Sequence, residues 1–274
     1  MNVKKLKIGF IGGGNMGEAL IAGLLNQNVL RPGDIGVAEP DAARLKKLKA
    51  KYKILSRATN AELAATSEAI LLAVKPQQMT SVLNEIYPHL TPRHLVLSIA
   101  AGLDASYFRD KLPSKTRFIR IMPNLCSMIG EGAAALYAAP SATGQDRTFA
   151  KKIFAASGKA VFVESEELLD TVTAVSGSGP AFVFLFIDAL IQAGAARGLA
   201  AELGKELVLQ TLTGATKMVE ASKEPIAEMI GRVASKGGTT EAGLKVLADL
   251  DFRKLIDQTI GAAAERAAQL RKLS

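Results

Sequence analysis

The first 163 residues alternate between short apolar runs and stretches of helical composition, and this alternation constrains the fold more than any other feature. Runs that read as strands cover residues 7–11, 34–38, 69–74, 95–99, 117–121 and 160–163. Helical patterns lie between them, over residues 18–27, 42–51, 78–87 and 147–156. Strands that alternate with helices are typical of a parallel sheet with crossover helices. We therefore expect an α/β domain at the N-terminus.

The pattern changes after about residue 164. Strand-like runs stop, and helical patterns follow one another over residues 166–175, 181–197, 200–222, 225–233, 240–249 and 252–272. The predicted organisation is a Rossmann-like domain over residues 1–164 and an all-helical domain over residues 165–274. Several of these helices are apolar around most of their circumference, which a small bundle cannot hide. The helical domain is therefore predicted to form a homo-oligomer.

Composition narrows the class of protein. Cys126 is the one cysteine, and no Cys/His cluster offers a metal-ligand set, so a metal-free protein of the cytoplasm is expected. The net charge of +8 comes from scattered Lys and Arg without interleaved aromatics. This favours solvated helix faces over a nucleic-acid surface. The apolar run 181–186 is closed by Asp188, and a bilayer span needs about 20 apolar residues, so neither a membrane role nor a targeting segment is expected.

A glycine-rich turn follows the first predicted strand. Residues 12–17 read Gly-Gly-Gly-Asn-Met-Gly and open a helix, which is the G-x-G-x-x-G pattern in the strand-turn-helix context that gives it meaning. Gly12 suits the tight turn, Gly14 a close backbone approach to a pyrophosphate, and Gly17 the packing of helix on strand. Free N–H groups at the helix start would hold phosphates. We predict a dinucleotide site; the alternative is a purely structural glycine turn.

Glu39 ends the second predicted strand. An acidic side chain there usually accepts hydrogen bonds from the adenine-ribose hydroxyls, which favours NAD and repels the 2'-phosphate of NADP. Arg44, one helical turn further on, weakens that preference. The alternative is that Glu39 is only a solvated strand end.

The usual catalytic side chains are scarce. His89 and His94 lie in a proline-bounded loop and are expected at the surface, and Cys126 is expected to be an inert thiol. What remains are small and polar loops at strand ends, over residues 73–76, 98–102 and 122–124. Such a site suits hydride transfer, because the nicotinamide carries the reactive atom. A protonated imine is an undemanding acceptor, since it already bears the charge that a ketone would need a general acid to develop.

Two glycine-rich turns interrupt the helical half. Residues 176–180 read as a capped, closely packed helix start. In residues 235–240, consecutive backbone N–H groups from Gly238, Thr239 and Thr240 lie beside the cation Lys236 and would cradle a carboxylate. A plain helix cap is the alternative for this second turn, although a cap needs only one Ser or Thr.

Together these motifs resemble the pyrroline-5-carboxylate reductase family. The resemblance runs in order through nearly the whole chain, and its last two motifs are the most specific. The motifs lie at residues 10–17, 73–76, 98–102, 120–124, 175–181 and 235–240. The resemblance implies reduction of Δ1-pyrroline-5-carboxylate to L-proline with NADPH or NADH, the final step of proline biosynthesis. It also implies a Rossmann domain, a helical dimerisation domain, and homodimers that often assemble into decamers.

Matching positions carry the family's site residues onto this chain. With Gly17 and Glu39 added from the argument above, the predicted cofactor contacts are Ile11, Gly12, Gly13, Gly14, Asn15, Met16, Gly17, Glu39, Asn60, Ala73, Val74, Lys75, Pro76, Ala100, Ala101 and Gly102. The predicted substrate contacts are Ser235, Lys236, Gly237, Gly238, Thr239 and Thr240. The Thr240 hydroxyl is placed near the ring nitrogen as the catalytic group. Lys236 departs from the family, where many members have proline.

Two other functions fit parts of the pattern. One is a 3-hydroxyacid or 6-phosphogluconate type reductase, but those use a lysine on a helix of the second domain, and residues 181–197 contain none. The other is a cofactor-binding regulatory protein without turnover, against which the intact 235–240 turn argues.

Overall fold

The computed structural model describes residues 5–272, which form two compact units. The sheet unit comprises the described residues up to Ser178 together with those from Ala263 onward, and the helical unit is Gly179–Ala262. The predicted boundary at residues 164/165 lies earlier along the chain than this division and stays a prediction.

The sheet unit is built on one eight-stranded sheet with the order β3-β2-β1-β4-β5-β6-β7-β8. Its strands are β1 (Leu6–Ile11), β2 (Ile35–Ala38), β3 (Leu55–Ser56), β4 (Ser67–Leu72), β5 (Leu95–Ser98), β6 (Arg117–Met122), β7 (Gly132–Ala138) and β8 (Gly158–Phe162). All neighbours pair in parallel except β6 and β7. The predicted α/β class is confirmed, and the sheet is parallel as predicted except at the β6–β7 pair.

Strands β3 and β7 were not predicted. β7 has the sequence GAAALYA, and alanine has the highest helix propensity, so its composition favours a helix. The structure instead pairs it on one side with β6, where Ile121 faces Leu136, and on the other side with β8. Neighbouring strands therefore override local propensity here.

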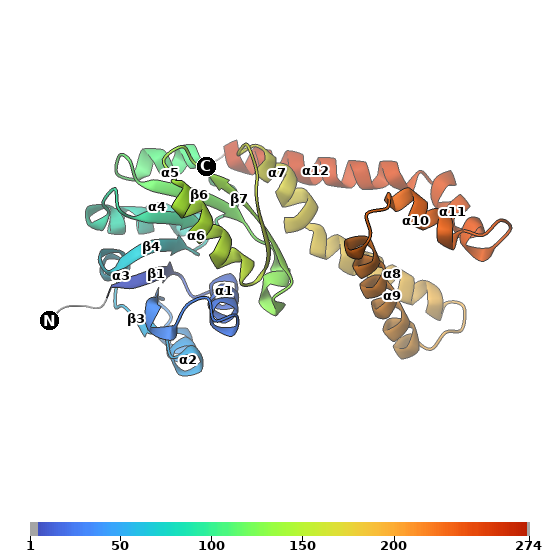
Figure 1. Ribbon diagram of the computed structural model, residues 1–274, viewed down its shortest axis with the longest axis horizontal. Coiled ribbons are helices and arrows are strands. Elements are labelled where there is room, and N and C mark those ends of the chain that lie inside the picture. Colours follow the sequence, from blue (N-terminus) through green and yellow to red (C-terminus); the bar gives the residue numbers. More distant parts are fainter. Residues whose placement is uncertain (1–4, 273–274) are drawn as a thin grey trace. The chain divides into compact units, whose positions relative to one another are not determined.

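Helices cover both faces of this sheet (Figure 1). They are α1 (Asn15–Asn26), α2 (Ala42–Tyr52), α3 (Asn60–Thr66), α4 (Pro76–Ile86), α5 (Ala105–Lys111) and α6 (Gly144–Ala155), followed by α7 (Leu168–Val172). Within β4, Leu71 packs into the core with α1, α2 and α6, while Ile70 packs into the core with α3, α4 and α5. Alternate strand residues thus serve opposite layers, as expected for a sheet buried on both faces.

The predicted turn at residues 176–180 is part of a helix. α7 continues through a π-helical turn, Thr173–Gly177, into α8 (Gly179–Ala195). A Cβ added at Gly177 would lie 2.6 Å from the Met122 methyl, so the close packing expected there is present, whereas the expected helix start is displaced to Gly179. Pro180 then occupies the first turn of α8, where its missing N–H costs nothing.

The helical unit follows the predicted segments closely. After α8 come α9 (Ala201–Ala221), α10 (Ile226–Val233) and α11 (Thr239–Asp249), and α12 (Phe252–Lys272) leads back into the sheet unit. Helix α8 packs on α9. Few side chains are covered: α8, α10 and α11 have no buried residue, and α9 buries only Gly204.

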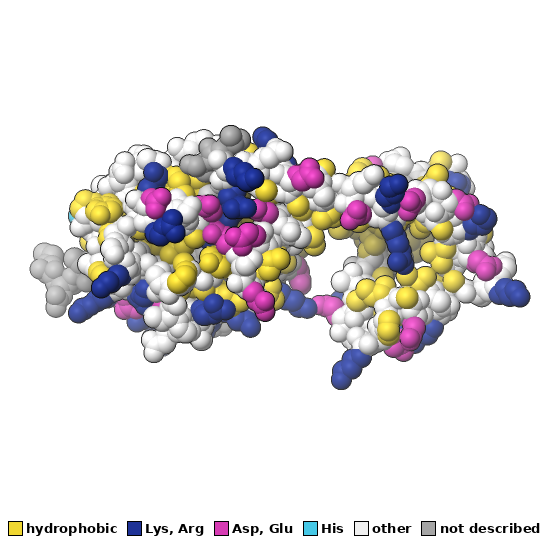
Figure 2. Space-filling model, turned by 90° about the horizontal axis from the view of Figure 1, so that it is seen from above, with side chains coloured by type: hydrophobic (Ala, Val, Ile, Leu, Met, Phe, Trp, Pro, Cys, Tyr) yellow, Lys and Arg dark blue, Asp and Glu magenta, His cyan; other side chains and the backbone are white. Residues whose placement is uncertain are grey.

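Large apolar side chains are exposed across the surface of the helical unit (Figure 2). Leu185 is 69% exposed, Val233 67% and Leu250 74%. Residues 168–195 form a continuous helix of 28 residues. Its most apolar 18-residue window has a mean hydropathy of 1.7, and 11% of that window is buried. By length and composition alone, this helix is able to cross a membrane. It is longer than the apolar run seen in the sequence, because the π turn joins α7 to α8.

Candidate active site

The glycine-rich turn joins β1 to α1, and the structure explains the three glycines of the G-x-G-x-x-G pattern. Gly12 has φ +93°, and a Cβ there would lie 2.8 Å from the Ala73 carbonyl oxygen. A Cβ at Gly17 would lie 2.8 Å from the Gly12 carbonyl oxygen. A Cβ at Gly14 would meet nothing within 4 Å. Gly12 and Gly17 therefore serve the fold, whereas Gly14 leaves open space beside the backbone.

Helix α1 begins at that open space without a capping side chain. Gly14 is its N-cap residue, and no side chain of the described residues caps the helix. The first N–H groups of a helix have no partner within it, and the helix dipole adds partial positive charge there. The start of α1 is therefore suited to hold an anion.

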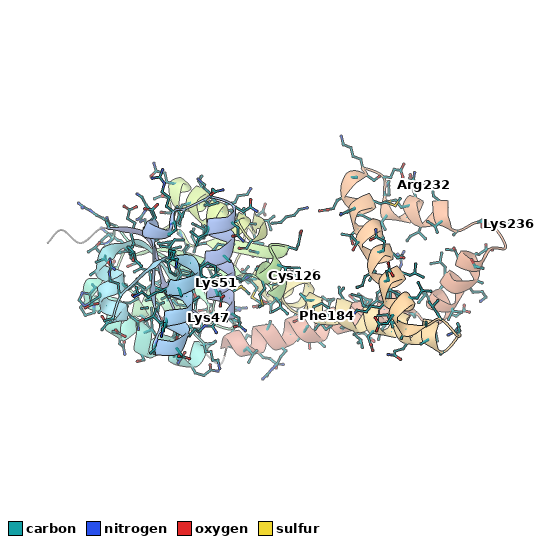
Figure 3. All side chains as sticks on the ribbon, turned by 90° about the horizontal axis from the view of Figure 1, so that it is seen from below. Lys47, Lys51, Cys126, Phe184, Arg232 and Lys236 are labelled. Carbon is teal, nitrogen blue, oxygen red and sulfur yellow. The ribbon has the colours of Figure 1, made fainter. Side chains whose placement is uncertain are left out.

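Glu18, on the first turn of α1, would oppose an anion if its charge stood alone. It accepts hydrogen bonds from Lys51 Nζ at 3.1 Å and from the Tyr52 hydroxyl at 3.0 Å (Figure 3 labels Lys51). Burial raises the pKa of Glu18, but these hydrogen bonds together with the charges of Lys51 and Lys47 outweigh it and hold the pKa below its usual value. Its negative charge is thus balanced from α2, away from the glycine turn.

A groove at the carboxyl ends of β1, β2 and β4 gathers many of the predicted cofactor contacts. Those that line it are Ile11, Gly12, Gly14, Glu39, Asn60, Ala73, Val74 and Lys75. Gly13, Asn15, Met16 and Gly17 belong to the adjoining turn and helix start, and Pro76 is the first residue of α4. Ligands of open α/β sheets bind at this edge, so the groove has the place that a dinucleotide requires.

Glu39 lies in the groove with its carboxylate held on both oxygens. It accepts hydrogen bonds from the Gly13 amide at 2.7 Å and the Asp41 amide at 3.0 Å. Arg44 does not pair with it: the guanidinium donates to the Gly13 carbonyl and, at 3.2 Å, to Asn15 Oδ1. The glycine turn is thus fixed from β2 and α2, and Glu39 is more than a solvated strand end.

Glu85 is a groove residue that sequence reasoning missed. From α4 it accepts a hydrogen bond from Asn60 Nδ2 at 2.7 Å and another from the Asn60 amide at 3.0 Å. It therefore caps α3 and orients the Asn60 side chain. Nothing in the local sequence signals this pair, because its members are 25 residues apart and meet only through the fold.

The loop after β5 carries the remaining predicted cofactor contacts. The Ile99 amide donates to the Leu72 carbonyl of β4 at 3.3 Å, so the loop leaves the sheet beside the residue that precedes the groove-lining segment 73–75. Ala100 is buried, Ala101 is exposed, and Gly102 has φ +78°, a conformation that favours glycine.

The second predicted site lies at the start of α11. Gly238 is the N-cap, and its own amide donates to the Ser235 carbonyl at 3.0 Å. A Cβ at Gly238 would lie 2.5 Å from Ser235 Oγ, and Gly237 has φ +71°. Lys236 is exposed on the same turn (Figure 3). Ser235 and both glycines thus shape the turn.

Two backbone amides of this turn remain available at the helix start. Thr239 and Thr240 are the first residues of α11, where N–H groups have no partner within the helix. Thr240 is half-buried and Thr239 is exposed. The Gly237 amide, by contrast, donates to the Glu241 carboxylate at 2.6 Å, an interaction that sequence reasoning missed. Of the three amides predicted to cradle a carboxylate, that of Gly238 is engaged with Ser235, so those of Thr239 and Thr240 remain.

The two histidines and the cysteine, which the sequence does not favour as catalytic residues, differ in their surroundings. His89 is exposed as predicted, but the prediction for His94 was wrong: it is 9% exposed and its ring Nδ1 accepts from the Thr91 amide at 2.9 Å. The fold buries His94 because it directly precedes the buried strand β5. Cys126 is half-buried and unpaired. Within residues 5–272 no three His, Cys, Asp or Glu side chains cluster as a metal site.

Comparisons with known proteins agree with this arrangement. The family described as pyrroline-5-carboxylate reductase dimerisation matches residues 166–270, and the NADP oxidoreductase, coenzyme F420-dependent, family matches residues 7–102. The second match contains the glycine turn and the groove residues up to Glu85. The dimerisation match contains the helices with exposed apolar side chains and the turn before α11.

Relatives match over nearly their whole length. The pyrroline-5-carboxylate reductase of Pseudomonas aeruginosa is 38% identical over 264 residues, 96% of each chain. That of Synechocystis is 39% identical over 267 residues, covering 97% of this chain and 99% of the relative.

Solved structures match in the same way. The pyrroline-5-carboxylate reductase of Coxiella burnetii has a TM-score of 0.92 and 33% identity, covering 97% of this chain and 99% of the other. The Plasmodium falciparum enzyme, solved with NADP bound, has a TM-score of 0.86 and 33% identity, covering 98% of this chain and 100% of the other. The chain belongs to the pyrroline-5-carboxylate reductase family.

Proposed function

We propose that this protein reduces Δ1-pyrroline-5-carboxylate to L-proline with NADH or NADPH, as the last step of proline biosynthesis. The observation that carries the proposal is the uncapped start of α1, which opens onto a groove at the carboxyl edge of the sheet. Membership of the family supports the choice of substrate.

The residues of the groove fit a dinucleotide. Gly14 leaves room for a pyrophosphate to approach the backbone, and the first amides of α1 donate to it. Glu39 and Asn60 line the part of the groove between β2 and α3, where an adenine ribose would lie. Ala73, Val74 and Lys75 line its β4 side, and Ala100, Ala101 and Gly102 follow the neighbouring strand β5. The reduced nicotinamide would supply the hydride.

The turn before α11 fits the carboxylate of the substrate. The amides of Thr239 and Thr240 donate to the carboxylate, aided by the dipole of α11 and the nearby charge of Lys236. The Thr240 hydroxyl then hydrogen-bonds the ring nitrogen and orients the imine. No side chain has to deliver a proton during the reaction if the imine is bound in its protonated form.

The exposed apolar surface of the helical unit supports a homodimer. The family that matches residues 166–270 is described as a dimerisation domain, and exposed apolar patches of this kind mark interaction surfaces. We infer that a second copy covers α8 and its neighbouring helices. Assembly of dimers into a decamer and a place in the cytoplasm belong to the same proposal; the mass in solution and cell fractionation test them.

Turnover tests the proposed activity directly. The purified protein should consume NADH or NADPH, seen as loss of absorbance at the nicotinamide band, only after pyrroline-5-carboxylate is added, and proline should accumulate in equal amount. Binding of reduced dinucleotide with no turnover would contradict the proposal and favour a regulatory protein instead.

A further inference from the structure

The loop that follows β5 is held from two directions by ion pairs that the reaction does not use. The loop runs from Ile99 to Asp104 and contains the proposed cofactor contacts Ala100, Ala101 and Gly102. The partners that hold it come from the segment before α7 and from the last turn of α12, both within the sheet unit.

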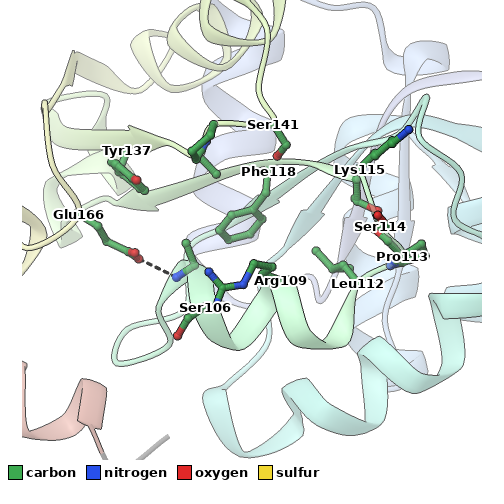
Figure 4. A pocket seen from close by; sticks show the side chains of 14 residues that line it. Ser106, Arg109, Leu112, Pro113, Ser114, Lys115, Phe118, Tyr137, Ser141 and Glu166 are labelled. Atoms are coloured by element: carbon green, nitrogen blue, oxygen red, sulfur yellow. Dashed lines mark hydrogen bonds between the residues drawn. The ribbon is translucent and has the colours of Figure 1, made fainter.

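On one side, Glu166 fastens the end of the loop. Its Oε1 accepts hydrogen bonds from the Ala105 amide at 2.7 Å and from Arg120 Nη1 at 2.8 Å. The dashed line in Figure 4 marks the first of these bonds, beside a pocket lined by α5 and β6. The Arg120 side chain is 5% exposed and that of Glu166 14%, so the pair is almost fully withdrawn from water.

On the other side, the end of α12 lies against Gly102. A Cβ added at Gly102 would lie 3.6 Å from Leu270 Cβ, which is ordinary van der Waals contact. The next residue, Arg271, is bound to Asp170 of α7, with both Nε and Nη2 3.0 Å from Asp170 Oδ2. The last turn of a helix frays unless it is tied down. This ion pair therefore keeps Leu270 in place against the loop.

The two pairs also act on the loop electrostatically. Asp104, the last loop residue, caps α5 by accepting from Ser106 Oγ at 2.6 Å and the Tyr107 amide at 2.9 Å. Burial raises the pKa of Asp104, but these hydrogen bonds and the charges of Arg120 and Arg271 outweigh it, so the pKa lies below its ordinary value. Both arginines thus stabilise the ionised cap that ends the loop.

We propose that Arg271 is a positioning residue for cofactor binding: through Asp170 and Leu270 it holds the Ala100–Gly102 loop in the shape that meets NADH or NADPH. The proposal rests on the proposed function only in assuming that this loop touches the dinucleotide. Arg271 itself does not lie among the residues that line the groove. A loop that is held before the ligand arrives binds more tightly, because less ordering has to occur on binding.

The test is Arg271→Met in the full-length protein, with Arg271→Lys and Arg266→Met beside it. Arg266 lies on the same helix, is exposed, and donates a hydrogen bond to its helical neighbour Gln269, so it is a matched control. Binding of the reduced dinucleotide is titrated by fluorescence without substrate. Arg271→Met should raise the Kd and the KM for the dinucleotide about tenfold, with kcat changed less than about twofold. Arg271→Lys should recover part of the affinity.

Asp170→Asn keeps the test valid if Arg271→Met unfolds, since it breaks the ion pair with Arg271 from the other side and leaves no buried carboxylate without a partner. It should also raise the Kd. If Asp170→Asn and any folded Arg271 variant bind the dinucleotide within twofold of Arg266→Met, whatever their melting temperatures, the positioning role is refuted. A wild-type protein that binds no dinucleotide at all would instead contradict the proposed function.

Discussion

The two units of this protein differ in how completely each buries its own apolar side chains. In the sheet unit, strands and helices bury their apolar faces in two cores, and Gly12 and Gly17 of the turn have close neighbours. In the helical unit, Leu185, Leu203 and Val246 are among many apolar side chains left at the surface. The sheet unit therefore buries its own core, whereas the helical unit leaves exposed the apolar side chains that the proposed homodimer would cover.

The sharpest test of the self-contained site is Gly14→Val. The added side chain enters open space, so the free energy of unfolding should change little, but it fills the place of the pyrophosphate. Loss of two charge-assisted amide contacts, each worth about 1.5–3 kcal/mol, should weaken dinucleotide binding at least about 100-fold by fluorescence titration.

Gly12→Val provides the contrast within the same turn. There the Cβ collides with the Ala73 carbonyl and φ is +93°, so the melting temperature should fall as well. Equal stability losses in the two variants would show that the turn is structural throughout and that Gly14 faces no ligand.

The incompleteness of the helical unit is tested by Leu185→Asp on α8. If Leu185 packs against the partner in the proposed dimer, a carboxylate buried in its place should cost at least about 2 kcal/mol, which raises the dimer dissociation constant about 30-fold. Sedimentation over a range of protein concentrations measures it. Tyr87→Asp, a comparably exposed position on the sheet unit, is the control. A wild-type protein that is monomeric at micromolar concentration would contradict the proposed dimer and with it this difference between the units.

The turn before α11 is tested by Thr240→Ala. Losing one polar contact to the ring nitrogen should lower kcat/KM for pyrroline-5-carboxylate by about 1–3 kcal/mol, with little change in dinucleotide affinity. Thr239→Ala should cost much less, because its contribution comes from the backbone amide. If the two variants behave alike, the Thr240 hydroxyl has no part in the mechanism.

The sequence predicted those features of the fold that depend on local chemistry. Gly12 and Gly17 lie in the turn that their spacing indicated, and the helix boundaries near residues 221, 233 and 249 agree with capping and periodicity. It did not predict β7, because an alanine-rich strand becomes a strand only through its neighbours.

The polar interactions that fix the candidate site are harder to see in a sequence. Glu85 meets Asn60, and Arg271 meets Asp170, across 25 and 101 residues of chain. Such pairs depend on which helix lies beside which, and neither helical periodicity nor motif spacing encodes that. His94 was misplaced for the same reason, since its burial comes from the start of a central strand and not from its proline-bounded loop.

The charges beside the groove predict which coenzyme the enzyme prefers. In the proposed binding mode the Glu39 carboxylate would face the 2'-phosphate of NADPH, whereas the Arg44 guanidinium is bonded to the glycine turn. NADH should therefore be used in preference to NADPH, and Glu39→Ser should raise kcat/KM for NADPH relative to NADH about tenfold. Glu62, whose carboxylate accepts a hydrogen bond from the Ala58 amide outside the groove, provides the control: Glu62→Gln should leave the ratio unchanged. A wild-type enzyme that strongly prefers NADPH would show that Arg44 turns toward the phosphate.

The smallest expected effect concerns the buried histidine of the sheet unit. Burial lowers the pKa of His94 below its ordinary 6.5, despite its hydrogen bonds with Thr91. Below pH 6.5 the unfolded chain therefore takes up a proton at this position that the folded chain resists, so the free energy of unfolding falls as the pH is lowered from 6.5 toward the folded pKa. His94→Asn should flatten that part of the pH dependence in urea unfolding curves, whereas His89→Asn, at an exposed site, should leave it as it is. An unchanged slope in His94→Asn would mean that the sheet unit opens enough to hydrate this ring, and the contrast between a closed unit and an incomplete one would be weaker than the packing indicates.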